Sequence, residues 1–184
     1  MTGYDGKELA NSFRTVRKNT IQVAEDIPES KYDHVAAPEV RPVKQMLAHI
    51  AVSTRMWQEI HKNNRTNMQG VDFLTMMDRL NAEEAKPRTK AEIVEMLRND
   101  GEAFAVWLES LTPEELAQTV GDGEGKNGKA RIEWLRGAKE HEMHHRAQLM
   151  LIERQLGIVP HLTRNSNEQL AKMRAAKGQS AGAA

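Results

Sequence analysis

The sequence predicts an all-α protein built as a four-helix bundle. Four segments carry apolar residues at steps of three and four, which is the spacing of one helix face, and runs that alternate as strands do are almost absent. A length of 184 residues is enough for one domain with its own core. We therefore expect a single bundle domain over residues 1–162, followed by a polar tail over residues 163–184.

Each long helix has recognisable ends. Pro28 ends the first stripe, and Pro42 is suited to the start of the second. Thr89 and Glu92 form a capping box before the third stripe, and Gly157 stands where the fourth helix should stop. The four predicted helices cover residues 9–27, 43–60, 93–111 and 131–156.

Smaller elements are expected between and after these helices. Within the largely polar residues 64–86, the apolar positions Phe73, Met76, Met77 and Leu80 predict a short extra helix across one end of the bundle. A turn of helix begins in 111–115, and the glycine-rich residues 121–129 favour a small hairpin. Beyond Pro160 the composition is that of a tail, with a short helix expected over 166–176.

Composition excludes several classes of function. Lys plus Arg equals Asp plus Glu at 26 each, so no net field attracts nucleic acid or an anionic membrane. Cysteine is absent, which removes disulfides, thiolate ligands and a cysteine nucleophile. No apolar run approaches a membrane span, and the first residues lack the apolar stretch of a secretory signal, so a cytoplasmic protein is expected.

The most informative feature is the run His141-Glu142-Met143-His144-His145 inside the fourth helix. His141 and His145 stand one turn apart on one helix face, where two imidazoles can bind a single divalent metal. His49 is the best third ligand, because it falls on the apolar face of the second helix, where an unpaired imidazole is costly to bury. The prediction is a three-histidine site of His49, His141 and His145.

Other residues are assigned lesser roles. His144 points about 100° away from His145 and is expected at the surface. His34, His61 and His161 lie in loops or at a helix end, where a solvated imidazole is the default. Four further side chains are candidates for contacts to the ligands or for a substrate pocket, namely Ser53, Trp57, Glu142 and Gln148.

The same run permits two other interpretations. It matches H-E-x-x-H, in which two histidines bind zinc and the glutamate polarises water for peptide hydrolysis. However, Gln148 and Leu151 stand where a metzincin has glycine and histidine, and Glu168 is the only plausible later glutamate ligand. Glu142 and His145 also form E-x-x-H, which di-iron bundles use in duplicate, but only one copy is present.

Two segments resemble a known family. Val43-Lys-Gln-Met-Leu-Ala-His49-Ile-Ala and His141-Glu-Met-His-His145-Arg-Ala-Gln-Leu are similar to the DinB-like (damage-inducible) superfamily of metal-binding bundles, over roughly residues 5 to 160. The resemblance implies a four-helix bundle of the DinB/YfiT-like type in which His49, His141 and His145 bind one divalent ion, often zinc or nickel. Ala147 replaces a glycine common in the family. It also implies a homodimer that does not bind DNA.

The resemblance also suggests an activity. Related members look like thiol-dependent enzymes, including S-transferases that use bacillithiol or mycothiol and a mycothiol-dependent maleylpyruvate isomerase. We therefore expect a metal-dependent enzyme of the thiol S-transferase type, with a low-molecular-weight thiol cosubstrate and a small-molecule substrate. The alternatives are a metal-dependent hydrolase, including the H-E-x-x-H peptidase, and a non-catalytic, metal-stabilised bundle that binds a ligand.

Overall fold

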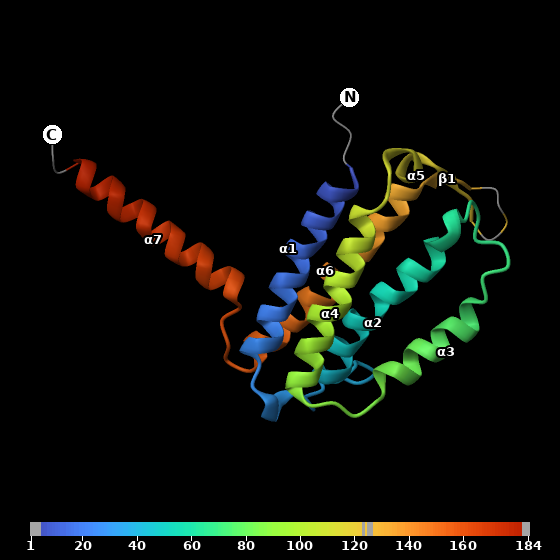
Figure 1. The fold of residues 1–184 in the computed structure, drawn as a ribbon. Coiled ribbons are helices and arrows are strands. Elements are labelled where there is room, and N and C mark those ends of the chain that lie inside the picture. The colour runs from blue at the N-terminus through green and yellow to red at the C-terminus, as the bar shows by residue number, and fades with distance from the viewer. Residues whose placement is uncertain (1–4, 123, 125–126, 182–184) are drawn as a thin grey trace.

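The structure is a computed structural model that describes residues 5–122, 124 and 127–181. Nearly all of this chain is helical, and the regular elements occur in an order close to the predicted one (Figure 1). They are α1 (Gly6–Asp26), the 3₁₀ turn η1 (Glu29–Lys31), α2 (Val43–His61), the 3₁₀ turn η2 (Lys62–Asn64), α3 (Phe73–Glu84), α4 (Lys90–Glu109), α5 (Pro113–Ala117), β1 (Thr119–Val120), β2 (Lys129–Ala130), α6 (Arg131–Gln155) and α7 (His161–Ala181).

Helices α1, α2, α4 and α6 form the four-helix bundle (Figure 1). Helix α1 packs against α4 and α6, and α2 packs against the same two helices. The apolar stripe predicted for the first helix is buried along its whole length, because every third or fourth side chain faces the bundle interior. The all-α, four-helix-bundle prediction is confirmed. The stripe consists of Leu9, Phe13, Val16, Thr20, Val23 and Ile27.

Helix α3 lies alongside α2 and does not cross one end of the bundle as predicted. Its first half packs Met76 near Ile60 of α2, and its last residue, Glu84, contacts His49 farther back along α2. The two helices therefore run antiparallel. Because α3 covers the outer face of α2, residues 46–54 of α2 are all buried.

A short hairpin joins α5 to α6. Strands β1 and β2 are antiparallel, with Thr119 opposite Ala130, so the predicted hairpin is confirmed at its base, while residues 123, 125 and 126 lie outside the described residues. The Arg131 guanidinium is fully buried beside it and donates to the carbonyl oxygens of Glu115 and His61. These bonds attach the hairpin to the end of α2.

Helix α7 leaves the bundle and extends away from it (Figure 1). It covers 21 residues, more than the predicted 166–176, because its alanine, lysine, glutamine and leucine residues are good helix formers even without a strong apolar stripe. Its first residue, His161, is 5% exposed and lies 3.2 Å from the side-chain oxygen of Asn19 on α1.

Two expectations of solvated histidines were wrong. His161 is buried at the base of α7, and His61 is only 2% exposed because Arg131 and the hairpin cover it. No helix in the described part of the chain combines the length and the apolar character needed to cross a membrane.

Candidate metal centre

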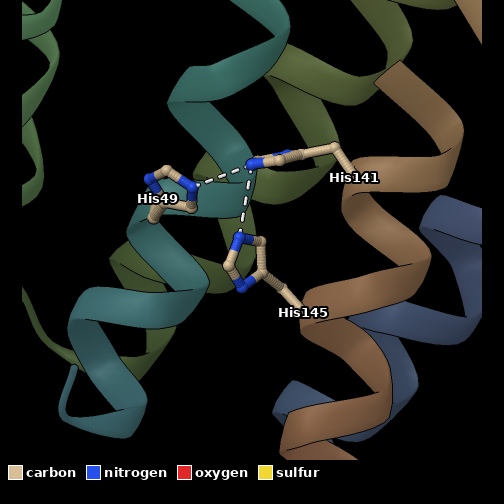
Figure 2. Close-up of side chains that lie close together, drawn as sticks. All are labelled: His49, His141 and His145. Carbon is tan, nitrogen blue, oxygen red and sulfur yellow. Dashed lines mark hydrogen bonds between the residues drawn. The ribbon is translucent and has the colours of Figure 1, made fainter. Parts of the chain in front are cut away.

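Three histidines from two neighbouring helices converge on one point (Figure 2). His49 comes from α2, while His141 and His145 come from successive turns of α6. The Nε2 atom of His141 lies 3.0 Å from Nε2 of His49 and 3.2 Å from Nε2 of His145. The structure therefore brings together the three residues that the sequence analysis selected as ligands.

Hydrogen bonds on the far side of two rings fix where their protons are. The Nδ1 of His49 contacts a carboxylate oxygen of Glu84, which only accepts, so Nδ1 carries the proton and Nε2 a lone pair. The Nδ1 of His145 lies 2.8 Å from Oε1 of Gln148 and donates to it in the same way. Two lone pairs therefore point toward the Nε2 atom of His141, which is the arrangement expected of ligands that share one cation.

The His141 and His145 rings are neutral at physiological pH. Burial, reinforced by the neighbouring histidines, lowers the pKa of His141 to about 4. Burial also lowers the pKa of His145, although its hydrogen bond with Gln148 acts in the opposite direction. Neutral imidazole is the form that binds metal, so these two rings are already in their ligand state at pH 7.

The spacing of His141 from each of the other two rings fits a shared divalent ion, and the three ligand atoms all lie within 4.8 Å of one another. Metal to imidazole bonds of 2.0–2.1 Å place two ligand nitrogens about 3.0 Å apart at a right angle and about 3.4 Å apart at a tetrahedral angle. The distances of 3.0 and 3.2 Å fall within that interval. In addition, Nδ1 of His141 is buried without a hydrogen-bond partner, which leaves Nε2 as the polar atom through which this ring can interact. The donor set therefore suits a borderline ion such as zinc or nickel.

Glu84 is a functional residue that the sequence analysis missed. One oxygen contacts His49, and the other accepts from Nε of Arg41 at 3.1 Å. Burial by itself raises the pKa of Glu84, but the bond from His49 and the charge of Arg41 outweigh it and hold the pKa below its usual value. The carboxylate is thus ionised and orients the His49 ring, as carboxylates behind metal-binding histidines commonly do.

Glu142 does not belong to the pocket in which it was expected. One residue along a helix is a rotation of about 100°, so Glu142 faces α1 while His141 faces α2. Its two oxygens each accept from Arg17, at 3.0 Å from Nε and 3.0 Å from Nη2, and both side chains are almost fully buried. The carboxylate is therefore occupied in the core, and the role of a water-polarising base or a di-iron ligand does not fit it.

Of the other three candidate residues, Gln148 contacts a predicted metal ligand, whereas Ser53 and Trp57 only lie near the ligands. Gln148 contacts His145 as described, and its amide nitrogen lies 3.4 Å from Nε2 of the exposed His144. Ser53 is buried, but its hydroxyl donates to the carbonyl of Ile50 within the same helix. Trp57 packs against Gly137, one turn of α6 before His141, and does not hydrogen-bond to the histidines themselves.

Comparison with known proteins agrees with this architecture. The model of the DinB superfamily matches residues 12–149. The DinB-like protein YjoA of Bacillus subtilis is 21% identical and covers 82% of this chain and 92% of its own, with a TM-score of 0.60. YfiT of B. subtilis, described as a probable metal-dependent hydrolase with an unusual four-helix bundle topology, is 15% identical and covers 86% and 91%, with a TM-score of 0.65. No curated protein matches significantly. The chain belongs to the DinB superfamily.

Proposed function

We propose that this protein is a divalent-metal-dependent enzyme of the thiol S-transferase type, with one zinc or nickel ion held by His49, His141 and His145. The observation that carries the proposal is the convergence of imidazole lone pairs whose opposite nitrogens are bonded to Glu84 and Gln148. Three neutral ligands keep the full charge of the ion and leave a coordination position open, which is the arrangement of catalytic sites. A homodimer and a small-molecule substrate belong to the same proposal.

The state of the nearby carboxylates favours a thiol as the nucleophile. A divalent ion at such a site lowers the pKa of a thiol or of water and so supplies a nucleophile at neutral pH. Glu84 is bonded to His49 and Arg41, and Glu142 is bonded to Arg17, so neither glutamate is placed to remove a proton from a substrate. A thiol, with an ordinary pKa of about 8.5, needs far less assistance than water.

A metal-dependent hydrolase is the second candidate, because YfiT is described as a probable metal-dependent hydrolase. Here the same three histidines hold the ion, and water takes the place of the thiol. A third possibility is a bundle that uses the ion only for stability. In that case metal removal lowers the melting temperature, and no reaction accompanies metal binding.

Metal content of purified variants tests the ligand set. We expect His49→Ala to lose metal as severely as His145→Ala, since each removes one of three bonds, whereas His144→Ala keeps full occupancy because its ring is exposed and outside the cluster. Elemental analysis of the three variants provides the measurement. Full occupancy in His49→Ala contradicts the three-histidine centre.

Mass spectrometry then separates the candidate activities. The metal-loaded protein is incubated with bacterial low-molecular-weight thiols and a library of electrophiles, with and without thiol. Thioether products that require both the thiol and His145 support the transferase. Products of water addition that form without thiol support the hydrolase instead, and metal-dependent stability without any product supports the non-catalytic bundle.

A further inference from the structure

A cavity of about 330 Å³ opens between the last turns of α2 and the first turn of α6, about two helical turns from the candidate metal ligands. This volume lies at the lower end of the range for small-molecule sites, and it is about twice that of an engineered apolar cavity that holds benzene. Residues of α2, the α2–α3 connection, the first turn of α3, the hairpin loop and the first turn of α6 line it, namely Met56, Trp57, Ile60, His61, Met68, Phe73, Asp122 and Trp134.

The wall of the cavity is almost entirely apolar. Trp134 donates its indole N–H to the carbonyl of Val120 at 3.0 Å, so its polar edge is satisfied by the backbone. The carboxylate of Asp122 accepts from the backbone N–H of Glu124 at 3.0 Å and from the amide of Asn127 at 2.8 Å. Its charge is thus directed into the loop, and the cavity offers rings and methionine side chains, with the buried ring nitrogens Trp57 Nε1 and His61 Nε2 as its polar atoms without a partner among the described residues.

His61, the remaining titratable lining residue, is neutral. The Nη1 atom of Arg131 lies 3.4 Å from Nδ1 of His61, and because a guanidinium only donates, Nδ1 accepts and Nε2 carries the proton. Burial, assisted by the charge of Arg131, lowers the pKa of His61 to about 4. The Arg131 charge is itself directed toward the carbonyl oxygens of Glu115, His61 and Arg65.

We propose that this cavity binds a small, uncharged aromatic or alicyclic group, and the proposal goes beyond the metal chemistry. An open apolar pocket of this size, lined by two indole rings, has the character of a small-molecule site. Phe73 stands at the cavity with 42% of its surface exposed, which provides an apolar entrance. A charged group is disfavoured because the described lining residues include no Lys or Arg and the one carboxylate, that of Asp122, is bonded within its loop.

The cavity and the metal centre share the same two helices. Trp57 lies two turns after His49 on α2, and Gly137 lies one turn before His141 on α6. A Cβ atom at position 137 would lie 2.8 Å from Cη2 of Trp57, so the indole occupies the space that the glycine leaves. Trp57 therefore connects the wall of the cavity with the turn of α6 that precedes His141.

The three indole N–H signals provide a direct test. The ¹⁵N-labelled full chain is titrated with 2-naphthol, and the Trp57 and Trp134 signals are expected to shift saturably, while that of Trp107, which lies outside the cavity on α4, stays in place. Phe73→Ala should weaken binding at least about threefold. Leu74→Ala is the matched control, because its side chain is 80% exposed and does not line the cavity.

The charged analogue 2-naphthoate should bind at least about tenfold more weakly than 2-naphthol. Binding should persist in His145→Ala, so that failure of the metal proposal and failure of this one can be told apart. The proposal is overturned by absent or non-saturable shifts, by equal affinity for the two compounds, or by an unchanged affinity in Phe73→Ala. Shifts of Trp57 and Trp134 that depend on protein concentration without ligand also overturn it, because a second copy then fills the space.

Discussion

The buried pair of Arg17 and Glu142 gives the most decisive test of how the H-E-x-x-H run is used. In a peptidase, replacing the glutamate by glutamine removes catalysis and leaves stability nearly unchanged. In this structure Glu142 neutralises a guanidinium inside the core, with the two side chains 2% and 4% exposed. We therefore predict that Glu142→Gln mainly destabilises the fold and that the metal content is retained.

The magnitude follows from the burial of the pair. Removing one partner of a buried ion pair costs about 3–5 kcal/mol, because the other charge is left uncompensated. Arg17 retains its bonds to the carbonyls of Leu97 and Ile50, so we expect the lower end, about 3 kcal/mol. For a chain of this size this corresponds to a melting temperature lower by roughly 6–12 °C.

Urea unfolding of the metal-free protein measures the effect, with elemental analysis of the purified variant beside it. The matched control is Arg14→Met, which breaks exposed pairs with Glu102 and Glu109 and should cost less than about 1 kcal/mol. The double variant Arg17→Met/Glu142→Met should recover much of the loss, since no charge remains buried. A Glu142→Gln protein as stable as the parent refutes the reasoning.

Two further predictions follow from other buried carboxylates. Glu84→Gln should weaken zinc affinity roughly 10- to 100-fold in chelator competition, because the His49 ring loses its charged partner. Glu83→Gln is the control, because Glu83 does not contact His49. Equal zinc affinities of the two variants would argue against the role of Glu84. Burial, with the charge of Asp26, raises the pKa of Glu153 to about 7, above its unfolded value of about 4.5. Its contribution to stability is therefore full below pH 4.5 and is lost as the pH rises through 7. Glu153→Gln should stabilise the protein by about 2–3 kcal/mol at pH 8 and little at pH 4.5, measured by thermal melts at both pH values.

The bundle was predictable because its four helices carry the periodicity that burial on one face requires. The stripe from Leu9 to Ile27 is buried at each predicted position. The course of α3 was not predictable, since its few apolar residues show that it packs but not against which surface. The extent of α7 was underestimated for the opposite reason, because helix propensity without an apolar stripe gives a weak pattern.

In the site, too, the residues related by spacing within one helix could be predicted, whereas those brought together only by the tertiary fold could not. His141 and His145 lie one turn apart by helix geometry alone, and His49 was selected because an imidazole on an apolar face needs a partner. Glu84 could not be found in this way, since 35 residues separate it from His49 and only the antiparallel course of α3 brings them together. The inward direction of Glu142 was misjudged because Arg17, a charged residue in an otherwise apolar stripe, gave no sign of being buried.

Arg17 explains how a bundle held mainly by apolar contacts can place three imidazoles accurately. Its guanidinium donates to the carbonyl of Ile50, the residue after His49, and to the carboxylate of Glu142, the residue after His141. Gly101 on α4 leaves the room it needs, because a Cβ there would lie 2.8 Å from Cγ of Arg17. A single cation from α1 thus fixes the position of α2 relative to α6 at the level of the ligands. The glutamate of the H-E-x-x-H run therefore acts here from the α1-facing side of the helix, where its bond to Arg17 helps to hold the histidines in place.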